Sequence, residues 1–118
     1  MASECGARNL AQKLVDLLSD KRASDIVLLD LRRVASFTDY FIIATGESRR
    51  QLEALLTALE EELKKDGVTP MGREGDPESG WVLLDLGDIV VHLFGPSERA
   101  YYDLERLWYR AEPVLRIS

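Results

Sequence analysis

The sequence predicts an α/β or α+β fold in which helices pack on a single mixed β-sheet. Two observations carry this prediction. Segments with apolar residues at helical spacing alternate with short apolar runs typical of strands. The chain has 118 residues, of which 46% are hydrophobic and 31% are charged, a composition typical of globular proteins. This length fits one domain over residues 1–118 and leaves no room for a cleft between two domains.

The N-terminal part of the chain predicts a helix and then two strands. A stripe of leucines at positions 10, 14, 17 and 18 predicts a helix over about 3–19. Two runs that are apolar on both faces follow, at 25–31 and 39–45. Because such runs are typical of strands covered on both sides, we expect both to lie inside the sheet.

A second helix is predicted after the second strand. Ser48 and Gln51 form the S-x-x-Q pattern of a capping box, which marks a helix start. Leucines then recur at helical spacing until Gly67, which follows a cationic turn and marks the helix end. The free N–H groups at 46–50 also allow an anion site, but the capping box explains these residues without a ligand.

The second half of the chain predicts a short strand, a hairpin and a last helix. Residues 68–71 form the short strand, which Pro70 places at a sheet edge, and 72–80 form a loop. Residues 81–94 form a hairpin around a two-residue turn at Gly87-Asp88. The last helix opens at Gly95-Pro96 and ends before Pro113.

The hairpin register separates an aliphatic face from a mixed aromatic and polar face. A two-residue turn pairs Leu83 with His92, and Asp85 with Val90. The aliphatic face must lie in the core, whereas the mixed face is either covered by a helix or offered to a partner. In this register Asp85 lies diagonally across from His92 on the same face and is a candidate to orient its imidazole. Four side chains characterise the mixed face: Trp81, Asp85, His92 and Phe94.

The last helix carries more aromatic rings than one helix face can bury. Some of these rings must therefore be exposed or lie in an interface. The acidic Asp103 and Glu105 beside them favour a basic partner. The rings in question are Tyr101, Tyr102, Trp108 and Tyr109.

The charge balance argues against several classes of function. With 15 Lys and Arg against 21 Asp and Glu, the net charge is −6, which disfavours direct binding to nucleic acid or to an anionic membrane. It suits a basic partner, or solubility alone. Cys5 and His92 are the only residues of their types, so we expect no zinc site, no Cys–His dyad and no intramolecular disulfide. We also expect no cofactor, no membrane span, no signal peptide and a cytoplasmic location.

Three stretches of the chain resemble, in order, the three signatures of the ribosomal silencing factor family, also called the Iojap family. Together they lie within residues 8–113. The first is TDYFIIATG at 38–46, followed by Ser48 and Arg50-Gln51; the second is Glu74-Gly75 with GWVLLD at 80–85 and GDIVVH at 87–92; the third is RAYYDLERLW at 99–108.

This resemblance implies a fold similar to that of nucleotidyltransferases, without transferase activity. It implies binding to protein fourteen of the large ribosomal subunit, at the face that meets the small subunit. Occupying that face blocks subunit joining and represses translation when nutrients are short, and organellar relatives act in assembly of the large subunit. It also implies a homodimer in isolation.

The expected contact residues combine the resemblance with the aromatic and acidic pattern. Trp81, Tyr101 and Trp108 are expected to be desolvated anchors, and Asp85 and Glu105 to pair with basic side chains of the partner. The full contact set is Trp81, Asp85, His92, Tyr101, Tyr102, Glu105 and Trp108. Four further signature residues are assigned a structural role: Asp39, Tyr40, Ser48 and Gln51.

The alternative function is a nucleotidyltransferase-like enzyme or nucleotide-binding protein. It would use Asp39, Asp85 or Asp88 with magnesium, and phosphoryl chemistry of that kind needs clustered carboxylates. The sequence places Asp39 and Asp85 on different strands, without a Gly-Ser nucleotide loop before them. The sequence therefore favours a protein that acts by binding.

Overall fold

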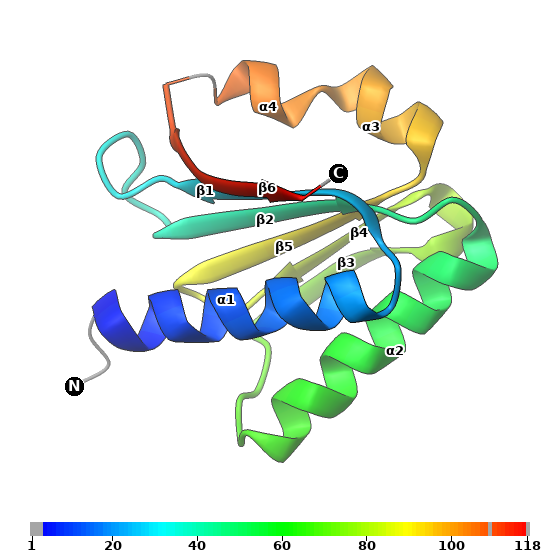
Figure 1. The fold of residues 1–118 in the computed structure, drawn as a ribbon, viewed down its shortest axis with the longest axis horizontal. Helices are drawn as coiled ribbons and strands as arrows, with labels where there is room; N and C mark the ends of the chain where they lie inside the picture. The colour runs from blue at the N-terminus through cyan, green and yellow to red at the C-terminus, as the bar shows by residue number, and fades with distance from the viewer. Residues whose placement is uncertain (1–3, 109, 118) are drawn as a thin grey trace.

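The computed structural model describes residues 4–108 and 110–117, with the side chains described from Gly6 onward. Within these residues, six strands form one sheet in the order β3-β4-β5-β2-β1-β6 (Figure 1). The β2–β5 pair is parallel and the other described pairs are antiparallel, so the sheet is mixed, as predicted. The strands are β1 (Ser24–Asp30), β2 (Tyr40–Thr45), β3 (Gly72–Asp76), β4 (Trp81–Asp85), β5 (Ile89–Phe94) and β6 (Glu112–Ile117).

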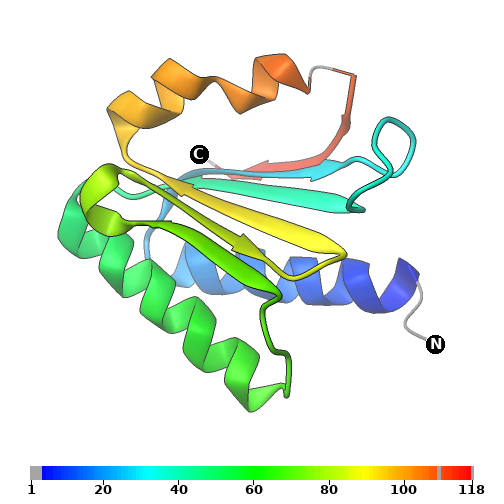
Figure 2. The same cartoon turned by 180° about the vertical axis from the view of Figure 1, so that it is seen from behind.

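Helices cover both faces of the sheet and enclose two cores. The long helices α1 (Glu4–Asp20) and α2 (Arg49–Lys65) lie on one face, and the short helices α3 (Pro96–Tyr102) and α4 (Leu104–Leu107) lie over the other (Figures 1 and 2). The α1 and α2 side holds the larger, aliphatic core. The opposite side holds a smaller core with aromatic members. None of the described helices is long and apolar enough to cross a membrane.

The two strands expected in the interior occupy the centre of the sheet. Every residue of β2 is buried, as are the four central residues of β1. A strand whose two faces are both covered reads as continuously apolar, which explains why its sequence shows no alternation. The prediction of interior strands is confirmed, and three of the four predicted boundaries differ by one residue.

The second helix begins at a cap that differs in part from the predicted capping box. Ser48 is the N-cap, and its hydroxyl accepts a hydrogen bond from the N–H of Gln51 at 3.1 Å. The Gln51 side chain does not close the box, because its carbonyl accepts from the N–H of Glu47 and its amide donates to the carbonyl of Arg22. Gln51 therefore ties α2 to the turn that follows α1.

The expected strand at 68–71 is wrong, because the edge strand lies at β3, in the segment expected to be a loop. β3 pairs with β4 along its whole length, and a 3-10 helix, η1 (Pro77–Ser79), connects the two strands. Every residue of β3 is exposed. Since this strand lies at the sheet edge and buries no side chain, its sequence carries no apolar signal.

The last helix also differs from its prediction. Asp103 adopts φ +46°, which interrupts the helix and separates α3 from α4. After α4 the chain returns to the sheet as β6, which pairs with β1 although it contains Pro113. Proline is tolerated there because β6 is an edge strand and needs hydrogen bonds on one side only. Tyr109, expected on this helix, lies outside the described residues.

Candidate protein-binding site

The predicted hairpin register is confirmed. Trp81 pairs with Phe94 and Leu83 with His92, and the N–H of Leu86 donates to the carbonyl of Ile89 across the turn. The aliphatic face of the hairpin faces the larger core, as expected. The mixed face therefore lies on the side of the sheet that carries α3 and α4.

Aromatic rings form a continuous series across this face. The series begins at Phe37, in the segment between β1 and β2, whose ring lies 6.0 Å from Phe41 and 5.8 Å from Trp108. It continues through His92 and Phe94 to Trp81, and then to the α3 tyrosines. The Trp81 and Tyr102 ring centroids are 4.3 Å apart, and those of Tyr101 and Tyr102 are 5.0 Å apart. The mixed face is thus in part a second core and in part a surface.

His92 belongs to the buried part of this face and is oriented by Trp81. Its side chain is 3% exposed, and its Nδ1 accepts a hydrogen bond from the Trp81 indole N–H at 3.2 Å. Burial lowers the pKa of His92 from 6.5 to about 4, so the imidazole is neutral at pH 7. The expectation that Asp85 orients His92 is wrong, because the Asp85 carboxylate accepts from the N–H of Gly87 at 2.8 Å and stabilises the turn.

Apart from Phe37, the exposed part of the face lies on α3 and α4. Tyr101 is 82% exposed, Leu107 68% and Tyr102 45%, which is unusual for large apolar side chains in a protein of this size. Trp81 and Trp108 are half-buried and pack against the second core. The structure thus brings together the aromatic residues of the expected contact set, with the tyrosines outermost and the tryptophans supporting them.

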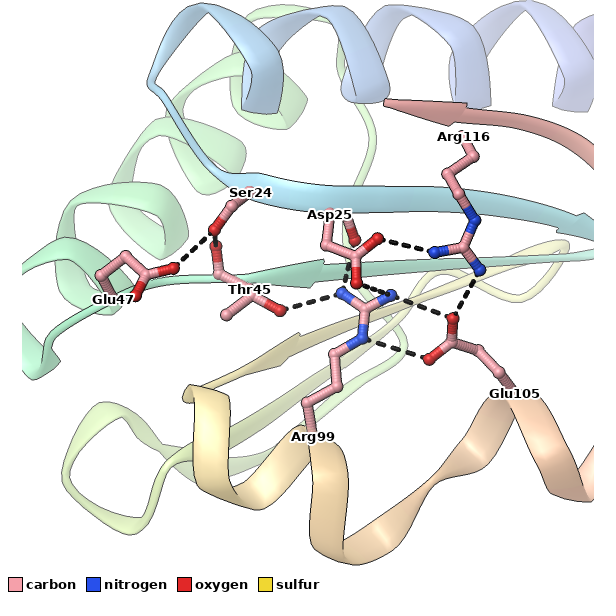
Figure 3. Close-up of polar contacts among 7 residues, drawn as sticks. All are labelled: Ser24, Asp25, Thr45, Glu47, Arg99, Glu105 and Arg116. Atoms are coloured by element: carbon pink, nitrogen blue, oxygen red, sulfur yellow. Dashed lines mark hydrogen bonds and ion pairs between the residues drawn. The ribbon is translucent and has the colours of Figure 1, made fainter. Parts of the chain in front are cut away.

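Arg99 connects α3 to the sheet through a network that the sequence did not reveal (Figure 3). Its buried guanidinium donates to the hydroxyl of Thr45 at 2.9 Å and to the backbone carbonyl of Asp25. It also pairs with the carboxylates of Asp25 and Glu105, at 3.5 and 3.2 Å. Arg116 on β6 contacts the same two carboxylates, at 2.7 and 3.0 Å.

Glu105 therefore has partners inside the chain, whereas we expected it to pair with a basic side chain of another protein. Desolvation acts to raise its pKa, but the hydrogen bonds and charges of Arg99 and Arg116 outweigh this effect and hold the pKa below its ordinary value. Its charge is already balanced by two arginines. Its part in contacting a partner remains a prediction.

The other signature residues occupy structural positions. Tyr40 is buried in the larger core, and the Arg32 guanidinium lies 5.5 Å from the centre of its ring. The backbone N–H of Asp39 donates to the carbonyl of Asp88, which joins the start of β2 to the hairpin turn. Within the described part of the chain, no three His, Cys, Asp or Glu side chains gather closely enough to hold a metal ion.

Sequence reasoning missed two residues of the site, Phe37 and Arg99. Phe37 is 59% exposed and extends the series of rings beyond Trp108, but it stands in a polar segment without any periodic pattern. Arg99 finds its partners 54 and 74 residues away along the chain, so that no local spacing could reveal them.

Comparison with known proteins agrees with the three signatures. The family model described as ribosomal silencing factor during starvation matches residues 5–117. Ribosomal silencing factor RsfS of Bacillus subtilis is 44% identical over 89 residues, which make up 75% of each chain. RsfS of Chromobacterium violaceum is 39% identical over 111 residues, which make up 94% of this chain and 91% of the relative.

Solved structures show the same fold. A crystal structure of a Chromobacterium violaceum protein matches with a TM-score of 0.82 at 39% identity, over 86% of this chain and 85% of that chain. A crystal structure of a Bacillus halodurans protein matches with a TM-score of 0.80 at 37% identity, over 92% of this chain and 98% of that chain.

Organellar proteins are also similar to this chain. The maize chloroplastic protein Iojap is 36% identical over 90% of this chain, and the mouse protein named mitochondrial assembly of ribosomal large subunit protein 1 is 34% identical over 91% of it. The chain spans about half the length of these two relatives. From the bacterial matches and the family model together, the chain belongs to the ribosomal silencing factor family.

Proposed function

We propose that this protein binds protein fourteen of the large ribosomal subunit and sterically blocks joining of the small subunit, which represses translation. The observation that carries the proposal is the pair of exposed rings on α3, Tyr101 and Tyr102, with the exposed Leu107 on α4. Exposed aromatic side chains held on a rigid support are typical of the energetic centre of protein interfaces. The half-buried Trp81 and Trp108 provide that support.

The charge of this region favours a basic protein over RNA. Residues 76–112 contain eight acidic side chains and three arginines. One of the three, Arg99, is buried and paired with carboxylates of the chain itself. An acidic surface is repelled by RNA phosphates and attracted by a basic protein, so that the particle would be recognised through one of its proteins.

A steric mechanism needs a stable surface and no chemical step. One domain seated on the joining face of the large subunit would occupy space that the small subunit needs. The names of the bacterial and mouse relatives, which refer to ribosomal silencing and to assembly of the large subunit, support the large subunit as the particle concerned. In a cell, such a protein would act on the ribosomes of the cytoplasm.

The test is a subunit-joining assay. Purified large subunits are mixed with increasing amounts of the protein, small subunits are added, and joined ribosomes are separated by sedimentation. We expect the yield of joined ribosomes to fall as the large subunits become saturated. An unchanged yield at saturation would refute the steric mechanism. The enzyme alternative has its own test, a calorimetric titration with nucleoside triphosphates and magnesium, and measurable binding there would favour it.

Tyr101→Ala tests the contact surface without disturbing the core, because the ring is almost fully exposed. We expect it to weaken binding to large subunits by about 2 kcal/mol, roughly thirtyfold, as for a truncated interface hot spot. Met71→Ala is the matched control, since Met71 is also an exposed apolar residue but lies outside the contact set. Equal binding by both variants would remove Tyr101 from the interface.

We further propose that two free copies pair through the same exposed rings, because one surface would then serve both partners. Sedimentation equilibrium should show a dimer for the wild-type chain and a weaker dimer for Tyr101→Ala. A dimer of unchanged strength in the variant would place the pairing surface elsewhere, and a wild-type monomer at all concentrations would exclude the dimer.

A further inference from the structure

A pocket of about 220 Å³ opens beside the exposed rings, at the edge of the sheet formed by β3 and β4. It lies between β3, η1, β4 and the end of α3. Two aromatic rings, an aliphatic side chain and a carboxylate line it together with small residues. The lining residues are Glu74, Gly75, Ser79, Trp81, Leu83 and Tyr102.

The aromatic wall of the pocket consists of Trp81 and Tyr102. Their rings lie 4.3 Å apart at 45°, and Phe94 stacks against Trp81 at 5.1 Å. The indole N–H of Trp81 is already donated to His92. What Trp81 offers the pocket is therefore its π surface, which attracts cations and planar guanidinium groups.

Glu74 gives the pocket a carboxylate, which accepts hydrogen bonds. Glu74 pairs with Leu83 across the β3–β4 ladder, so its side chain shares the face that carries Trp81. Its carboxylate makes no hydrogen bond or ion pair with the residues that the structure describes. The Ser79 hydroxyl is used internally, since it donates to the carbonyl of Asp76 and approaches that of Trp81.

Two basic side chains near this end of the sheet have other partners. Arg73, next to Glu74, pairs with Glu60 of α2 at 3.1 Å. Arg49 lies 3.6 Å from Glu78. The pocket therefore combines an unpaired carboxylate, an aromatic wall and an apolar floor, and its chemistry is complementary to a cationic side chain with an apolar stem.

We propose that this pocket receives one arginine side chain of the basic protein to which the chain binds. The guanidinium lies against Trp81 and Tyr102 and donates to the Glu74 carboxylate, and the stem packs on Leu83. Arginine is preferred to lysine because its planar, weakly hydrated group both stacks on rings and binds carboxylates with two hydrogen bonds. This inference rests on the proposed function only for the identity of the partner.

The first test compares the affinity of three forms of the full chain for purified large subunits. We expect Glu74→Gln to raise the Kd about tenfold, as the loss of a charge-assisted hydrogen bond predicts, and to reduce its dependence on salt. Glu61→Gln is the matched control, because Glu61 is an exposed carboxylate on α2, on the other face. A Glu74→Gln variant that binds within twofold of wild type would overturn the pocket and leave the proposed function intact.

The second test probes the pocket without the ribosome. N-acetyl-arginine amide is titrated into the ¹⁵N-labelled protein, and the indole N–H resonance of Trp81 is followed. We expect a saturable shift that is smaller with N-acetyl-lysine amide and is lost in Glu74→Gln. The absence of a shift in the wild-type chain, or equal shifts in the wild-type chain and in Glu74→Gln, would overturn the inference. A clear shift in a wild-type protein that fails to bind large subunits would retain the pocket and refute the proposed function.

Discussion

Protonation of His92 should destabilise the fold. The size of this loss in stability follows from the burial of the imidazole. Burial lowers its pKa from 6.5 to about 4. A lowered histidine pKa means that the unfolded chain binds the proton more tightly than the folded chain, so stability falls as the pH drops below 6.5 and stops falling below about 4. By linkage, the loss is about 2 kcal/mol at pH 5 and about 3 kcal/mol when complete.

The hydrogen bond to Trp81 gives this loss a structural cause. Nδ1 of His92 accepts from the Trp81 indole, and the Nε2 atom is buried without a hydrogen-bond partner in the described structure. A protonated imidazole carries hydrogen on both nitrogens, so it can no longer accept from Trp81 and would leave two donors facing each other. Trp81 would have to move, and the ring series would be disturbed with it.

Urea unfolding at pH 7.5 and pH 5 measures the effect, with His92→Gln as the matched variant. The glutamine carbonyl can still accept from the indole but does not titrate in this range. We expect the wild-type chain to lose about 2 kcal/mol more than the variant between the two pH values.

Carboxylates contribute to the pH dependence of both proteins. The pKa of Glu105 is lowered in the folded state, so its stabilisation is complete above its ordinary pKa and is lost as the pH falls through the folded value. This contribution is common to both proteins and cancels in the comparison. If wild type and His92→Gln lose the same stability to within about 0.5 kcal/mol, the burial of a neutral His92 is not what governs the acid response.

Three further substitutions test the fold. Arg99→Met should lower the free energy of unfolding by about 3 kcal/mol, because it leaves the buried Thr45 hydroxyl and the partly buried Glu105 carboxylate without the guanidinium that binds them, and a loss below about 1 kcal/mol in urea would contradict this. Gly75→Ala should lower the free energy of unfolding by at least about 2 kcal/mol, because φ is +77° and a Cβ would lie 2.1 Å from the Trp81 carbonyl oxygen. Gly72→Ala is its control and should unfold like wild type, because the space around Gly72 is open. Ser48→Ala should cost about 1 kcal/mol through the lost cap, and an unchanged Tm would show that the cap contributes nothing.

Local rules predicted the parts of the fold that depend on neighbours in the sequence. The two-residue turn determines the hairpin register, since each residue of β4 has one possible partner once the turn is known. The leucine stripe and Gly67 likewise locate α2. Because β1 and β2 are buried on both faces, their sequences are continuous apolar runs, and these runs predicted both strands.

The edges of the sheet and the connections between distant elements could not be predicted in this way. β3 buries nothing and β6 contains Pro113, so neither carries the signal of a strand. The break at Asp103 uses a positive φ without glycine. The site depends on such long-range contacts, since Arg99 reaches Asp25 and Thr45, and since Trp81 rather than Asp85 meets His92.

The two sheet edges also determine how copies of this molecule can meet. β3 combines three charged side chains with Gly75 in a left-handed conformation, and at β6 Pro113 lacks a hydrogen to donate. Both features oppose addition of a further strand from a neighbouring molecule. Fibre-like growth, in which one sheet continues through many copies, is therefore disfavoured at either end, and a pair of molecules would associate through side chains and not through shared backbone ladders.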